Sequence, residues 1–172
     1  MKTRHALLHL VLFYLFVGFA HSQSYQVPQN FKLEKAEDYA KYVPEVLKCI
    51  EYLETTPLDS AQDTRKAANT FLLKWLTGSP SVEIEMQSYV TELAERNNDF
   101  LMIYLGGWAR HVLQSQSAPE NFSCHLAGLR SVLTVYQKGR GVKKDKRVEK
   151  LVALAKQEGK LEDWLKQRLK GK

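Results

Sequence analysis

The sequence contains few of the patterns on which enzymes depend. It has no nucleophile elbow of the Gly-x-Ser-x-Gly type, no glycine-rich phosphate loop and no dinucleotide fingerprint. His111 and His125 both stand outside a His-Glu-x-x-His motif, and neither has a second histidine three or four residues away. This spacing does not indicate a zinc site on a helix. We therefore expect no cofactor, no metal and no catalytic residue of a familiar kind.

Closely spaced carboxylates are the exception to this scarcity. Glycoside hydrolysis needs two carboxylates that face each other across a cleft, about 5–10 Å apart. Charges at helical spacing more often form a solvated helix face. A hydrolase is thus an alternative hypothesis, and its first suspects are the sets Glu83/Glu85, Glu92/Glu95 and Glu34/Glu37/Asp38.

Convincing strand patterns are also missing. After residue 33, apolar residues recur at steps of three and four, which is typical of amphipathic helices. The short alternation of Val82, Ile84 and Met86 is the one minor strand signal. The sequence predicts an all-α fold, a compact array or bundle of about six to seven short helices joined by short loops.

Four local features predict where helices begin, end or touch. Pro44 lies inside an apolar pattern and should kink or restart the helix. Ser60, with Asp63 three residues later, resembles a helix cap. Ser79-Pro80 should cap and open the next helix. Gly106-Gly107 lies in the most apolar part of the chain after residue 22, where we expect another helix to pack closely.

The first residues have the order of a secretory signal peptide. Met1 to His5 is basic, Ala6 to Ala20 is apolar, and Ala20-His21-Ser22 offers a small–x–small cleavage pattern. The alternative is a membrane anchor, but a spanning helix needs roughly 20 apolar residues. We predict a signal peptide over 1–22, export to the periplasm or beyond, and a mature chain without a transmembrane segment. An extended arm (23–33) then leads into a single helical domain (34–172).

The only two cysteines, Cys49 and Cys124, both lie in the expected mature chain. An oxidising compartment would allow a disulfide between them. The closed loop of about 75 residues would stabilise the fold by roughly 4–5 kcal/mol. The alternative is two buried free thiols that act as small apolar residues.

The positive charge is concentrated near the C-terminus. Residues 138–172 contain thirteen Lys and Arg against five Asp and Glu, whereas residues 23–137 contain ten against fourteen. Lys143, Lys144, Lys146, Arg147 and Lys150 cluster at the start of a basic helical hairpin (143–170). The cluster predicts either contact with an anionic surface or simply a solvated helix face. Nucleic acid is not expected, because no stacking aromatics interleave the basic residues.

Two resemblances accompany these patterns. Residues 136–159, from Tyr136 through Gly139-Arg140-Gly141 and Asp145 to Gly159, resemble part of a Sel1-like repeat. That resemblance implies a tight glycine turn between paired helices and an Asp cap on the second. A second copy and the repeat's later aromatic are missing, which favours a convergent helix–turn–helix. The whole chain, with Pro28–Lys32 and Gly141–Asp145, resembles uncharacterised exported helical proteins of Bacteroidetes-type bacteria.

The leading hypothesis is therefore an exported, non-catalytic helical module that binds a protein or supports an envelope component. A hydrolase with cleft carboxylates and an anionic-surface binder are the alternatives. The sequence does not identify the partner.

Overall fold

The computed structural model describes residues 25–170. The predicted signal peptide, residues 1–22, lies outside this range. None of the helices between residues 25 and 170 combines the length and the apolar composition that a membrane span requires.

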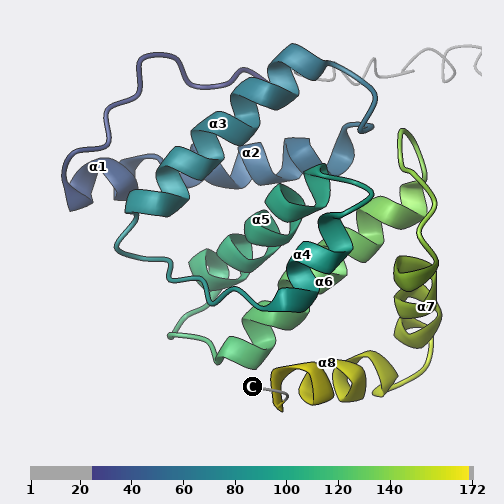
Figure 1. Ribbon diagram of the computed structural model, residues 1–172. Helices are drawn as coiled ribbons and strands as arrows, with labels where there is room; N and C mark the ends of the chain where they lie inside the picture. Colours follow the sequence, from purple (N-terminus) through teal and green to yellow (C-terminus); the bar gives the residue numbers. More distant parts are fainter. Residues whose placement is uncertain (1–24, 171–172) are drawn as a thin grey trace, which may run out of the picture.

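The described residues form eight helices and no strand, which confirms the all-α prediction (Figure 1). We expected at most seven helices. The eighth arises because the first apolar segment after residue 33 is divided into two helices. The helices are α1 (Ala36–Lys41), α2 (Val43–Thr55), α3 (Gln62–Gly78), α4 (Ser88–Ala94), α5 (Asp99–Gln114), α6 (Asn121–Lys138), α7 (Lys146–Ala155) and α8 (Lys160–Lys170).

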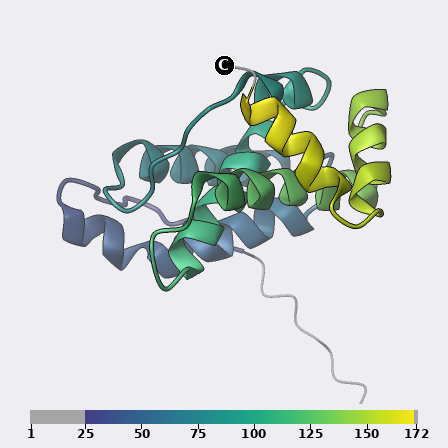
Figure 2. The same ribbon diagram turned by 90° about the horizontal axis from the view of Figure 1, so that it is seen from below.

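The helices α5 and α6 form the central pair of the fold. Helices α2, α3 and α4 pack against α5, and α7 and α8 pack against α6 and each other. Figures 1 and 2 show α7 and α8 at the edge of the molecule, away from α1 and α3. The core is one continuous cluster to which all helices except α1 contribute buried apolar side chains. The C-terminal hairpin lies along α6, because Lys166 of α8 lies over the Phe122 ring at the start of α6 and Tyr136 near its end bonds to Glu149 of α7.

Close approach at the glycine pair is confirmed. A Cβ on Gly107 would lie 2.3 Å from Ser131 Oγ and 3.0 Å from a backbone oxygen of α6. One on Gly106 would meet the side chain of Ile50 on α2 at 3.2 Å. From the other side, a Cβ on Gly128 of α6 would come within 2.8 Å of a backbone oxygen of α5. Small residues on both helices thus allow α5 and α6 to pack backbone to backbone.

Proline and glycine act at chain reversals as expected. Pro44 lies in the first turn of α2, so it restarts the helix after α1 rather than kinking one continuous helix. Gly139 and Gly141 adopt φ angles of 71° and 72° in the turn after α6. Such left-handed angles favour glycine, which lacks a Cβ. At Gly141 a Cβ would also collide with the backbone of Asp59 at 2.4 Å, so this turn is pinned against the α2–α3 loop.

Two predicted helix starts are wrong. Ser60 does not cap α3: Ala61, with φ of 48°, precedes its first residue, and the Ser60 hydroxyl lies near Asp59 instead. Ser79-Pro80 does not open a helix, because α4 begins only at Ser88. The intervening segment is held by tertiary contacts that local propensity does not contain. Val82 is buried, and the Glu83 carbonyl accepts a hydrogen bond from the Trp108 indole at 3.0 Å.

The non-helical arm lies on the core rather than away from it. Tyr25 stacks on Tyr52 of α2, with ring centroids 4.8 Å apart. Phe31 meets Phe71 of α3 edge-on at 5.0 Å. These aromatic contacts anchor residues 25–35 across the face formed by α2 and α3 (Figure 1).

Cys49 and Cys124 are separate, buried thiols, so the disulfide considered from the sequence is not formed in this structure. Cys49 on α2 is directed to α3, where its thiol donates to the Ala68 carbonyl oxygen at 3.4 Å. Cys124 lies in the first turn of α6. Burial raises the pKa of the Cys49 thiol to about 11, although a hydrogen bond with the Tyr25 side chain lowers it by a smaller amount. Burial also raises the pKa of Cys124.

The close approach of α5 and α6 predicts the effect of adding one methyl group. Gly107→Ala should lower the free energy of unfolding by about 1–3 kcal/mol, because the new Cβ forces the helices apart. Gly106→Ala is the matched control and should cost less, since the new Cβ would meet its nearest neighbour, the Ile50 side chain, only at 3.2 Å, whereas at Gly107 the nearest atom is at 2.3 Å. Urea unfolding followed by circular dichroism measures both. Equal stability of the two variants would contradict this account of the packing.

The thiol arrangement predicts two levels of reactivity. Both thiols should react slowly with a thiol reagent in the native protein, because each is buried and has a raised pKa. After denaturation without reductant, two thiols per chain should react, equal to the number of cysteines. The absence of any reactive thiol at that step would instead establish a disulfide.

Candidate functional site

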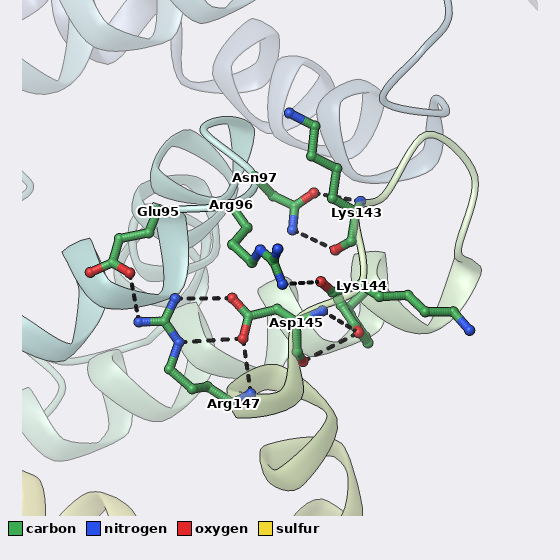
Figure 3. Close-up of polar contacts among 8 residues, drawn as sticks. Glu95, Arg96, Asn97, Lys143, Lys144, Asp145 and Arg147 are labelled. Atoms are coloured by element: carbon green, nitrogen blue, oxygen red, sulfur yellow. Dashed lines mark hydrogen bonds and ion pairs between the residues drawn. The ribbon is translucent and has the colours of Figure 1, made fainter.

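The cluster predicted from the sequence forms a basic segment, residues 143–150, that runs from the turn after α6 into α7. Its backbone is fastened to the α4–α5 loop (Figure 3). The Asn97 side chain accepts from Lys143 N at 2.8 Å and donates to Lys143 O at 2.9 Å. Arg96 donates to Lys144 O at 3.2 Å. Because Asn97 is itself buried, these bonds fix the position of the segment.

Asp145 fixes the start of α7. Its Oδ1 accepts the backbone N–H of Arg147 at 2.9 Å, which is the cap implied by the sequence resemblance. Arg147 also forms ion pairs with Asp145 at 3.1 Å and with Glu95 of the preceding loop at 2.8 Å. The Tyr136 hydroxyl accepts from Asp145 N at 2.9 Å. Figure 3 shows this network between the α4–α5 loop and α7.

The charge of Asp145 is stabilised in spite of its burial. Burial acts to raise the pKa of its carboxyl group, but the hydrogen bonds and charge of Arg147, with the charge of Arg96, outweigh it. The net effect holds the pKa of Asp145 below its usual value. Asp145 is therefore an ionised, buried anchor for the basic segment.

Within the described part of the chain, the lysines of the basic segment are not engaged in ion pairs, whereas its arginine is. Arg147 is engaged by Asp145 and Glu95. The other four are exposed, and their ammonium groups contact no hydrogen-bond or ion-pair partner among residues 25–170: Lys143, Lys144, Lys146 and Lys150. Figure 3 shows the Lys143 and Lys144 side chains extending away from the network. The structure thus combines a fixed backbone with unpaired positive charges.

A small cavity, which we call the hairpin groove, lies beside this segment between α4, α7 and α8. Its volume is about 160 Å³. Its rim carries Arg147, Lys150, Arg168 and Glu92, and its apolar lining comes from Tyr89, Leu93, Leu151 and Trp164. Trp164 packs edge-on against Tyr89 at 5.5 Å, and the Arg168 guanidinium lies over its ring at 5.4 Å. Two of the five predicted basic residues, Arg147 and Lys150, therefore line a cavity.

The sequence did not indicate the hairpin groove. Trp164 and Arg168 are four residues apart and so share one face of α8, which is a usable signal. No local pattern links Tyr89 and Leu93 to this face, because they come from α4, over fifty residues earlier in the chain. Only tertiary packing brings α4 and α8 together.

A second, open cavity of about 450 Å³ lies along α5 and α6 and contains His111 and Ser123. His111 Nε2 is 3.0 Å from Ser123 Oγ, a distance at which a base could activate a nucleophile. However, the Ser123 hydroxyl donates to the Glu120 carbonyl at 2.7 Å. A hydroxyl has one proton, so in this arrangement His111 donates to Ser123 rather than accepting from it. The pair stabilises the start of α6.

The remaining histidine belongs to a buried polar cluster. His125 Nδ1 lies 2.6 Å from the Tyr104 hydroxyl and 2.9 Å from the Tyr89 hydroxyl, and the two hydroxyls are 2.8 Å apart. The Trp108 ring packs edge-on against His125 at 4.6 Å. These contacts join α4, α5 and α6 within the core.

The suspected carboxylates lie in different surroundings. Glu92 lines the hairpin groove among cations, whereas Glu95 pairs with Arg147. Glu85 accepts from Asn121 at 2.9 Å. Asp38 accepts two backbone N–H groups at the start of α1. This placement favours structural roles over a facing pair of acids.

The Asp145 network predicts a pH-dependent stability difference between two variants. Asp145→Asn keeps a capping oxygen but removes the charge, and Asp145→Ala removes both, so Ala should be less stable than Asn by about 1 kcal/mol. Because the folded pKa of Asp145 is lowered, the wild-type advantage over Asn should be complete above the unfolded pKa of about 3.9. It should disappear as the pH falls through the folded pKa. Urea unfolding between about pH 6 and pH 3 measures this, and an advantage independent of pH would contradict it.

Comparison with known proteins adds no family to this picture. No family model, curated protein or solved structure matches the chain.

Proposed function

We propose that the protein is an exported, non-catalytic module that binds an anionic phospholipid surface through the basic segment. The observation that carries this proposal is the set of four unpaired lysines on a backbone fastened by Asn97, Arg96 and Asp145. A backbone segment that is already fixed loses little conformational freedom on binding. Each such lysine contributes about 1 kcal/mol near an anionic leaflet.

The distribution of charge supports a contact surface over a merely solvated helix. A surface that serves solubility alone has charges of both signs interspersed as a rule, but the basic residues of this chain are concentrated in 138–172 while 23–137 is net acidic. A molecule polarised in this way orients itself toward an anionic surface. Val148 and Leu151 anchor α7 on the core, so the lysines can remain outside without unfolding the hairpin.

Two further arguments support the location and the class of function. The order of residues 1–22 is that of a signal peptide, which would place the mature chain beside envelope membranes. The side chains with catalytic potential are used in structural bonds: His111 with Ser123, His125 with two tyrosines, and Glu95 with Arg147. Binding is the function that remains best supported.

The proposal predicts a charge-dependent loss of membrane binding. The double variant Lys143→Gln and Lys144→Gln should reduce partitioning to phosphatidylglycerol-containing vesicles by about 30-fold, from two lysines at about 1 kcal/mol each. The reduction should shrink as salt is raised, because the interaction is screened. Vesicle sedimentation over a range of lipid concentrations measures the partition coefficient.

The matched control is Lys41→Gln with Lys66→Gln. These two exposed lysines lie on α1 and α3, and their removal changes the net charge equally. The control should bind vesicles as the wild type does. Equal losses in both double variants would mean that net charge alone drives binding, and no binding by the wild type would reject the proposed function.

A further inference from the structure

We propose that the hairpin groove is a headgroup-binding site, which takes the phosphate of a single anionic phospholipid and the first carbons beneath it. This inference rests on the proposed function and assigns a specific subsite within it. The groove is lined by three cations and one carboxylate, so its charge is complementary to a phosphate.

The cations of the groove differ in availability. Arg147 is engaged by Asp145 and Glu95. Lys150 is exposed and has no ion-pair or hydrogen-bond partner within residues 25–170. Arg168 reaches Glu92 only at 3.9 Å, the outer limit of an ion pair between half-exposed groups. Such a contact contributes little and is easily replaced. Lys150 and Arg168 are therefore the two residues that can bind the phosphate.

The apolar part of the groove indicates that the ligand is more than a free anion. Leu93 and Leu151 are almost fully buried and supply the floor, while Trp164 remains partly exposed. The Trp164 ring is held between Tyr89 and the Arg168 guanidinium. Tryptophan in such a position is well suited to the boundary between headgroups and acyl chains. A volume of about 160 Å³ is too small for whole acyl chains, so the rest of the lipid would stay in the membrane.

Continuity with the basic segment favours a lipid over an acidic protein as the source of the phosphate. Lys146 and Lys150 are four residues apart on α7 and therefore lie on the same side of the helix. The rim of the groove thus continues directly into the unpaired lysines. The protein would then contact one headgroup in the groove and neighbouring headgroups of the same leaflet beneath the lysines.

The test uses a lipid that is soluble as a monomer. We would titrate the labelled protein with dihexanoyl phosphatidylglycerol below its micelle concentration and follow amide and indole resonances. We expect saturable shifts at Trp164 and along α7 and α8. Glycerol 3-phosphate, which lacks the acyl carbons, should bind more weakly.

Matched variants separate the subsite from the general surface. Lys150→Gln and Arg168→Gln should each weaken monomer binding about ten-fold or more, the loss expected for a charge-assisted bond. Lys143→Gln with Lys144→Gln should leave monomer binding unchanged, because neither residue lines the groove. All these side chains are exposed, and thermal unfolding at the wild-type temperature confirms an intact fold.

Each result has a distinct meaning. Vesicle binding that is lost in the Lys143/Lys144 variant, with no shift at Trp164 in the wild type, overturns the subsite and keeps the proposed function. Monomer binding without vesicle binding rejects the proposed function and keeps the groove as an anion site. Binding of an acidic peptide or a sulfated polysaccharide at the groove, with none of the lipid, overturns the lipid assignment.

Discussion

The contact between α5 and α6 is the constraint on which the remaining structure depends. Gly107 and Gly128 allow the two backbones to approach, and Ser131 lies in the space that a larger residue at Gly107 would need. The approach aligns Tyr104 with His125, so a polar cluster can form inside the core. It also fixes the two ends of α6, and with them the positions of the α5–α6 loop and of the C-terminal hairpin.

Helix starts and turns were predictable from the sequence where the backbone preferences of a single proline or glycine determine them. The restart at Pro44 and the turn at Gly139 follow from backbone restrictions that no distant residue changes. The segment after Gly78 was not predictable in the same way. Its serine and proline have the chemistry of a helix start, but burial of Val82 and the bond from Trp108 accompany a non-helical backbone up to Gln87. Tertiary contacts there outweigh propensity.

The candidate site shows the same division. The clustering of five basic residues is visible in the sequence, but their unequal roles are not. Arg147 is occupied because Glu95 and Asp145 flank it, and the first of these comes from a loop that is fifty residues away in the chain. The apolar half of the hairpin groove likewise requires α4 and α8 to meet. Sequence patterns record which charges are present, and packing decides which of them remain available.

The paired bonds of Asn97 with Lys143 join residues 46 positions apart, so they close a loop of chain that contains α5 and α6. Because closing a loop costs conformational entropy, the bonds depend on packing that holds the two segments together. The hairpin supplies this packing through four side chains buried in the common core: Val148, Leu151, Leu161 and Leu165. Hydrogen exchange of the Lys143 amide, whose bond Asn97 accepts, therefore reports local opening of this contact between the hairpin and the α4–α5 loop.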